Sequence, residues 1–147
     1  MYERFAKEAM QRELVTCVAS TPIEQIMRRL LDHAIHAIVV IDDEGYAIGI
    51  VSQTDILLAQ QQLALQGAGH LAASNIMSTE IITCGPDVTL LDAVTLMTRN
   101  HIHRLVVAKP SSERIYPLGI ISMTDVIRYV IKDTAGAPGP ALRFQSA

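Results

Sequence analysis

The apolar positions of this chain predict a helix, a buried strand, a return strand and a second helix, in that order. The first set recurs at the i, i+3, i+4 spacing of one helix face and comprises Ile23, Ile26, Met27, Leu30 and Leu31. Residues 38–41 form a continuous β-branched run, which is typical of a strand buried on both faces. A polar turn at 42–45 leads into a return strand at 46–51, and a helix begins after Asp55 and extends to about residue 66.

Local signals mark where the first helix starts. Thr21 is placed to cap this helix, Pro22 to occupy its first position and Glu24 its third. Thr89 and Asp92 mark a comparable start in the second half of the chain. The inner face of that second helix is expected to contain Leu90, Ala93, Val94 and Met97.

The second half of the chain repeats every step of the first. Its buried strand is expected at 105–108, its return strand at 118–121 and its closing helix at 126–131. The stretch 49–55 (GIVSQTD) recurs seventy residues later as 119–125 (GIISMTD), with five of seven residues identical. Earlier positions match at an offset of 67, and the three extra residues fall in the polar turn at 109–114. The chain is therefore two copies of one α/β unit, each too small to be stable alone.

Composition narrows the class of protein. Half of the 147 residues are apolar but only 4% are aromatic, so the core must be aliphatic. The net charge is −3 and no basic run exists, which argues against a nucleic-acid partner. No apolar stretch approaches the ~20 residues that span a bilayer, and the N-terminus lacks a signal-peptide pattern. We expect a soluble, cytoplasmic protein that has no membrane partner.

Cys17 and Cys84 occupy equivalent places in the two copies. In an intracellular chain two such thiols are more often buried small hydrophobic residues than a disulfide, although a pair across the repeat interface is conceivable. His101 and His103 would place both imidazoles on one strand face. No third and fourth ligands accompany them, so we expect no metal site.

The Ser-x-x-Asp of each copy admits two interpretations. In a capping box, the serine caps the helix and the carboxylate accepts a bond from the serine N–H. Alternatively, Asp55 and Asp125 accept hydrogen bonds from a ligand diol, with Ser52 and Ser122 nearby. The residues alone favour capping, and one aspartate can do both.

Each copy has the order strand, helix, two strands and helix, and its last helix begins at a Gly-h-h-Ser-x-x-Asp motif (h, apolar). Two such copies in one chain resemble a tandem pair of cystathionine-β-synthase (CBS) domains. Residues 100–107 (NHIHRLVV) resemble the nucleotide-binding repeats of the AMP-activated protein kinase gamma subunit. The resemblance implies an α/β fold of the α+β type, with two pseudo-symmetric β-α-β-β-α repeats packed sheet to sheet. The implied boundaries are an N-terminal segment (1–8), repeat 1 (9–66), a linker (67–74), repeat 2 (75–132) and a flexible C-terminal tail (133–147).

The resemblance also implies an adenosine-containing ligand, AMP, ADP or ATP, in the cleft between the repeats. Asp55 and Asp125 would bind the ribose hydroxyls, with Ser52 and Ser122 near the ribose or phosphate. Thr16 and Thr83 would line the adenine end. The residues entering the buried strands, His36 with Ala37 and His103 with Arg104, would line the adenine and phosphate ends.

The copies differ in charge at one of these places. Arg104 offers a planar fork for phosphate oxygens, whereas Ala37 stands in the other copy. Neither copy has the proline that family members often carry, because Val39 and Val106 occupy its places. We expect unequal sites, with the better phosphate site supported by His103 and Arg104.

The leading functional prediction is a regulatory module that senses an adenine nucleotide and controls an enzyme or transporter. The alternative is a ligand-independent dimerisation or docking module, since family members commonly form homodimers. Catalysis is not expected, because no nucleophile with a base, catalytic metal cluster or phosphate-binding glycine loop is present in the sequence. No catalytic residue or catalytic cofactor is therefore assigned.

Overall fold

The computed structural model describes residues 4–66, 69–110 and 113–135. The first repeat contains β1 (Thr16–Val18), α2 (Ile23–Asp32), β2 (Ala37–Ile41), β3 (Ala47–Ser52) and α3 (Gln53–Gln66). The second contains β4 (Thr83–Cys84), α5 (Leu90–Arg99), β5 (Arg104–Ala108), β6 (Pro117–Ser122) and α6 (Met123–Ala135). Two short helices precede these repeats, α1 (Ala6–Ala9) and α4 (Ala73–Ile76).

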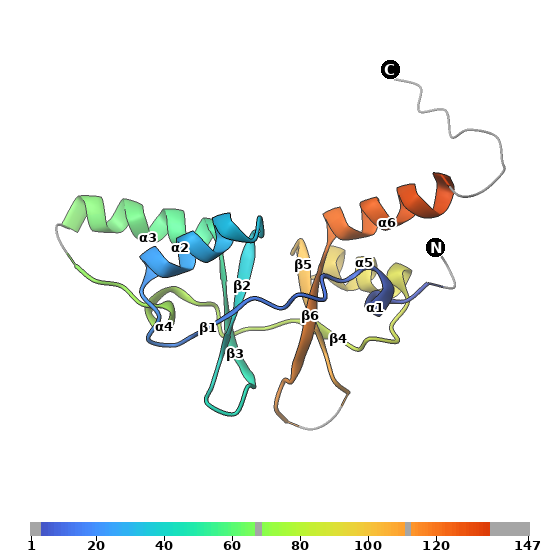
Figure 1. Ribbon diagram of the computed structural model, residues 1–147, viewed down its shortest axis with the longest axis horizontal. Coiled ribbons are helices and arrows are strands. Elements are labelled where there is room, and N and C mark those ends of the chain that lie inside the picture. Colours follow the sequence, from blue (N-terminus) through green and yellow to red (C-terminus); the bar gives the residue numbers. More distant parts are fainter. Residues whose placement is uncertain (1–3, 67–68, 111–112, 136–147) are drawn as a thin grey trace, which may run out of the picture.

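Each repeat forms a three-stranded sheet, in the orders β1-β2-β3 and β4-β5-β6. The central strand pairs in parallel with the first strand and antiparallel with the third. Figure 1 shows the two sheets facing each other, with α2 and α3 outside one sheet and α5 and α6 outside the other. The predicted α+β class with two β-α-β-β-α repeats is confirmed.

Three apolar layers hold these elements together. Ile26 and Ile38 belong to the layer between the first sheet and its helices, and Met97 and Leu105 to the corresponding layer of the second repeat. The third layer lies between the sheets and contains Val39, Ala47 and Val106. The central strands are buried on both faces, as their β-branched runs predict, because one face meets helices and the other meets the opposite sheet.

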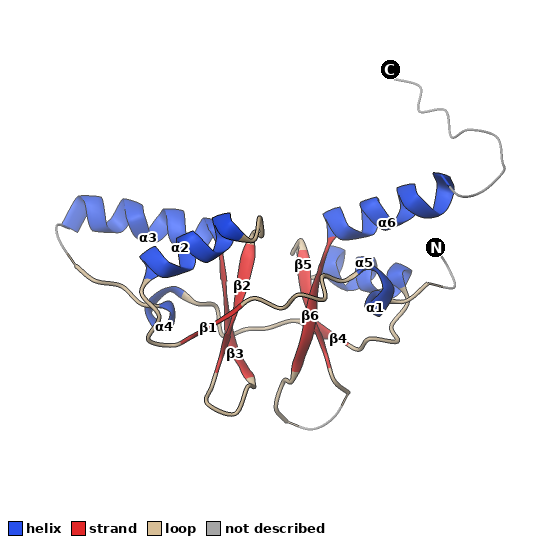
Figure 2. Cartoon of the chain, viewed as in Figure 1, coloured by secondary structure: helices blue, strands red, loops and turns tan. Residues whose placement is uncertain are grey.

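The segments that precede the two repeats cross between them. Ala6 of α1 is fully buried in the core of the second repeat, and Ala73 of α4 is fully buried in the core of the first. Figure 2 shows the chain running from α1 across the molecule to β1, and from α4 back to β4. Gln11 pairs with Ile120, and Ser78 with Ile50. Each sheet is therefore extended by a residue that leads into the other repeat.

The predicted domain boundaries remain predictions. α3 ends at Gln66, as expected, while the glycine-containing pair 67–68 lies outside the described residues. α6 continues to Ala135, three residues into the segment expected to be a tail, and 136–147 lie outside the described residues. Among the helices of the described ranges, none has both the length and the apolar character needed to cross a membrane.

The predicted start of α2 is wrong in its capping. The N-cap is Pro22 and no side chain caps the helix. Instead, the Thr21 hydroxyl accepts a hydrogen bond from the Val18 backbone N–H at 3.0 Å. The hydroxyl thus closes the turn after β1, and only in the second copy does the threonine, Thr89, accept from the third helical residue, Asp92.

The histidine pattern also differs from the prediction. His101 adopts φ 54° in the turn before β5, and that strand begins only at Arg104. His101 and His103 therefore do not share a strand face. Groups of three or more potential metal-ligating side chains are absent from the described parts of the chain.

Both cysteines are free and buried, at 3% exposure for Cys17 and 6% for Cys84. This confirms that they act as small hydrophobic core residues. Burial raises the pKa of the Cys84 thiol to about 11. It also raises the pKa of Cys17, where the Arg29 charge and a hydrogen bond with Thr21 oppose the effect.

Candidate functional site: a hollow between the repeats

The site is built on two equivalent strand-to-helix junctions. β3 ends at Ser52 where α3 begins, and β6 ends at Ser122 where α6 begins. The Ser52 N–H donates to the Asp55 Oδ2 at 2.8 Å, and the Asp55 N–H donates to the Ser52 hydroxyl at 3.2 Å. The same reciprocal bonds join Ser122 and Asp125 at 2.9 and 3.1 Å. Both motifs are therefore capping boxes, and the carboxylates are held at helix N-termini.

Asp125 is buried, with 6% of its surface exposed, although it carries a carboxylate. Its Oδ2 accepts from the Ser122 N–H, and its Oδ1 accepts from the Gln11 side-chain amide at 2.8 Å. The Arg128 guanidinium lies 3.6 Å from that same Oδ1. Buried carboxylates require such partners because desolvation is otherwise costly. Gln11 thereby connects the first crossing segment to the end of the second repeat.

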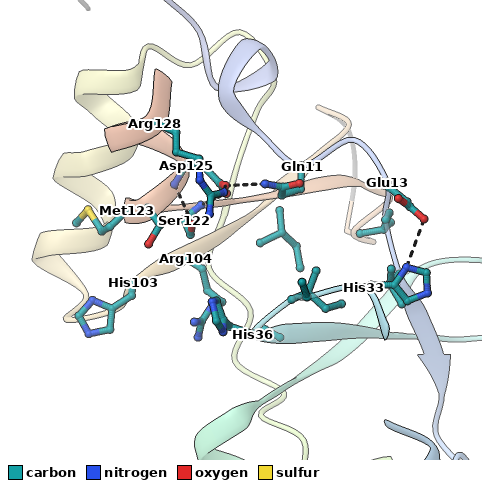
Figure 3. A pocket seen from close by; sticks show the side chains of 17 residues that line it. Gln11, Glu13, His33, His36, His103, Arg104, Ser122, Met123, Asp125 and Arg128 are labelled. Atoms are coloured by element: carbon teal, nitrogen blue, oxygen red, sulfur yellow. Dashed lines mark hydrogen bonds and ion pairs between the residues drawn. The ribbon is translucent and has the colours of Figure 1, made fainter. Parts of the chain in front are cut away.

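A hollow of about 440 Å³ opens beside Asp125 and is lined from both repeats. The first repeat supplies the crossing segment that contains Gln11 and Glu13, and the turn from His33 to Ala37. The second supplies His103, Arg104 and the start of α6. Figure 3 shows Arg104 and His36 across the hollow from Asp125 and Arg128. The hollow is thus a shared space that neither repeat forms alone.

Six of the ten residues predicted to bind ligand line this hollow: His36, Ala37, His103, Arg104, Ser122 and Asp125. Four do not line it: Thr16, Ser52, Asp55 and Thr83. Thr16 pairs with Val39 and Thr83 with Val106, so these threonines lie in the sheets. Ser52 and Asp55 form the equivalent junction of the first repeat.

Arg104 is half-buried at the start of β5, close enough to Asp55 for that charge to act on it. Burial lowers the pKa of its guanidinium, and the charge of Asp55 opposes that shift. The Arg104 side chain makes no hydrogen bond to another residue in the described ranges. Its N–H donors therefore remain available to an anion in the hollow.

Two lining residues were missed by sequence reasoning. Arg128 follows Asp125 by three residues, which places both on one side of a helix, and that spacing was a usable signal. Gln11 gave no such signal, since its contact with Asp125 spans 114 positions of sequence. Glu13 and His33 form a further long-range pair at the rim, with Oε1 and Nδ1 3.4 Å apart.

Comparison with known proteins agrees with this architecture. The sequence model of the CBS domain family matches residues 6–62 and 73–132, one match for each repeat. The chain belongs to the CBS domain family, and its two matches form a tandem CBS pair.

Several curated relatives are similar over most of this chain. It is 26% identical over 130 residues to the 5′-AMP-activated protein kinase subunit gamma-3 of Bos taurus, which aligns with 85% of this chain. The chain spans only 26% of that subunit's length. It is also 26% identical to the CBS domain-containing protein YhcV of Bacillus subtilis, with 89% of each chain covered.

Solved structures share the fold. The CBS domain pair of MJ0100, in complex with 5′-methylthioadenosine and S-adenosyl-L-methionine, superposes with a TM-score of 0.76 at 20% identity, covering 88% of this chain and 97% of that one. CBSX2 in complex with AMP superposes with a TM-score of 0.71 at 22% identity, covering 89% and 98%. At these identities the likeness concerns the arrangement of the elements.

Proposed function

We propose that this CBS pair is a regulatory module that binds an adenosine-containing nucleotide in the hollow between its repeats. The observation that carries the proposal is the shared hollow, which is lined by a buried carboxylate, Asp125, and by the guanidinium-bearing Arg104. A ribose diol is a hydrogen-bond donor suited to the carboxylate, and phosphate oxygens are acceptors suited to the guanidinium.

The shape of the site supports regulation. Because residues from both repeats line the hollow, a ligand there contacts both and favours the arrangement that binds it better. AMP bound to CBSX2 and the adenosyl ligands bound to MJ0100 are the corresponding ligands of proteins with this fold. We assign no catalytic residue, and propose that the module regulates an enzyme or transporter.

Replacing Asp125 by alanine tests the ribose contact. A hydrogen bond to a charged group contributes about 1.5–3 kcal/mol, so Asp125→Ala should weaken AMP binding roughly ten- to a hundredfold. Isothermal titration calorimetry with AMP, ADP and ATP measures this. Unchanged affinity in the variant would show that the ribose contact is wrong.

The control for this substitution must remove a similar carboxylate elsewhere. Asp92 occupies the third position of α5, lies on the surface and is outside the hollow. Asp92→Ala should bind AMP like the wild type. Thermal melting of both variants separates lost binding from lost helix capping, because Asp125 also stabilises the start of α6.

A ligand-independent dimerisation or docking module is the second candidate. Exposed apolar side chains on α3 and α6 favour it, among them Leu57 at 68% exposure and Ile131 at 62%. Ligand at a hundred times its dissociation constant adds about 2.7 kcal/mol of stability. If no adenosine ligand raises the melting temperature of the wild type, the docking function is preferred.

A further inference from the structure

Two arginines line the Asp125 hollow with unfilled donors. Within the described part of the chain the Arg104 side chain makes no hydrogen bond, and the Arg128 guanidinium has one ion pair, with Asp125 at 3.6 Å. A guanidinium carries five N–H donors, so most of the donors of both side chains have no protein acceptor. The Arg128 side chain is 65% exposed, which leaves it accessible to a ligand.

The acidic groups of the hollow, in contrast, already have some of their acceptor positions filled. Both Asp125 oxygens accept hydrogen bonds, from Ser122 and Gln11. Glu13 is paired with His33 and its side chain is 81% exposed at the rim. The unfilled donors of the two guanidinium groups therefore outnumber the remaining acceptor positions of these carboxylates, a balance that suits an oxyanion.

The first repeat lacks the equivalents of these arginines. At the offsets that relate the copies, Ala37 corresponds to Arg104 and Leu58 to Arg128. The charge of Asp55 acts on Arg104, whereas Arg128 belongs to α6 and lies 3.6 Å from Asp125. Arg128 is thus the cation that distinguishes the Asp125 junction from the Asp55 junction.

We propose that Arg128 is a specificity-determining residue that makes the Asp125 hollow prefer 5′-phosphorylated adenosine ligands over unphosphorylated ones. The inference rests on the proposed nucleotide function and adds the position of the phosphate. The phosphate lies between the forks of Arg104 and Arg128, and the ribose lies toward Asp125. Arg128 reaches the phosphate from the surface of α6, one helical turn beyond the aspartate.

The experiment compares AMP with adenosine by calorimetry on the full chain. The wild type should bind AMP more tightly than adenosine. Arg128→Leu introduces the residue that the first repeat has at this position. It should weaken the affinity for AMP roughly tenfold and leave the affinity for adenosine within about twofold of the wild-type value. Arg128→Lys keeps the charge but loses the fork, so its AMP affinity should fall between the two.

Arg99→Leu is the matched control. Arg99 is an exposed arginine at the end of α5 and does not line the hollow. Arg99→Leu changes the net charge of the protein by the same amount as Arg128→Leu, so any general electrostatic effect on AMP affinity appears in both variants. Only a loss of AMP affinity that occurs in Arg128→Leu and not in Arg99→Leu supports a contact between Arg128 and the ligand.

Three results overturn the inference. Equal weakening of AMP and adenosine would mean that Arg128 only positions Asp125, and unchanged AMP affinity would mean that it contacts nothing in the ligand. In both cases the AMP affinity of Asp125→Ala still tests the proposed nucleotide function independently. A wild type that binds neither AMP nor adenosine would overturn the inference as well, together with the nucleotide function on which it rests.

Discussion

At the scale of single residues, Asp125 combines a structural and a ligand-binding arrangement. Its Oδ2 accepts the bond that closes the capping box of α6, while its Oδ1 faces Gln11 and Arg128. A carboxylate offers about four lone-pair sites, so these contacts leave room for a further donor. Capping and diol binding are therefore compatible on one side chain.

Cys84 provides a prediction of pH dependence. Burial raises its pKa from an ordinary 9.0 to about 11, so the folded state keeps the proton longer than the unfolded state does. Below pH 9 both states are protonated and the contribution to stability is complete. Between pH 9 and 11 only the unfolded thiol ionises, so the free energy of unfolding should fall.

Urea denaturation at pH 7, 9 and 10 measures this fall. Cys84→Ala should lose less stability than the wild type across that range, because the ionising group is gone. Cys17→Ala should change the slope less, since Arg29 and Thr21 oppose the pKa shift there. Parallel curves for the wild type and Cys84→Ala would contradict the prediction.

At the scale of elements, the glycine of each repeated motif allows a crossing segment to lie against a strand. A Cβ on Gly119 would lie 2.5 Å from the Gln11 carbonyl oxygen and 3.0 Å from the Met10 sulfur. A Cβ on Gly49 would lie 2.5 Å from the Met77 sulfur. The identical glycines are thus explained by the close approach of the crossing segments to β6 and β3.

Gly119→Ala should therefore destabilise the protein by about 1–3 kcal/mol, because a backbone carbonyl cannot move as a side chain can. Gly85→Ala is the matched control, since its nearest neighbour would be Val88 at 3.9 Å. Chemical denaturation measures both. If Gly119→Ala lowers the free energy of unfolding no more than Gly85→Ala does, the crossing segment can move away from β6 at little cost.

At the scale of the whole molecule, the exposed apolar residues of the closing helices predict self-association. Leu57 on α3 and Ile127 on α6 are 68% and 59% exposed, and Figure 1 shows both helices along the same side of the molecule. Each of these two helices thus carries an exposed apolar residue at an equivalent position of its repeat, and exposed apolar surface favours a partner. We predict a homodimer formed through α3 and α6.

Sedimentation analysis tests the dimer. The double variant Leu57→Glu, Ile127→Glu should shift the protein to monomer, because charges at an apolar interface are costly to desolvate. Leu31→Glu on α2, at a position 81% exposed, is the control and should leave the dimer intact. A wild type that is monomeric at micromolar concentration would refute the proposed interface.

Repetition made much of this molecule predictable. The helix-period face of α2 and the β-branched runs of β2 and β5 are local patterns, and burial selects apolar residues at those periods. Leu31 is an exception, because its spacing placed it on the α2 face but it is 81% exposed near the end of that helix. The capping boxes were equally readable, because Ser and Asp three residues apart meet wherever a helix starts. Thr21 was misassigned because a turn used its hydroxyl instead.

Contacts between distant parts of the chain could not be predicted from such local patterns. Ala6 carries no mark that it belongs to the core of the second repeat, and Gln11 none that it bonds Asp125. The order of elements and the helix starts follow from forces that act within a few residues. The hollow follows from how two sheets and two crossing segments pack, and packing depends on all surfaces at once, so its lining emerged only in three dimensions.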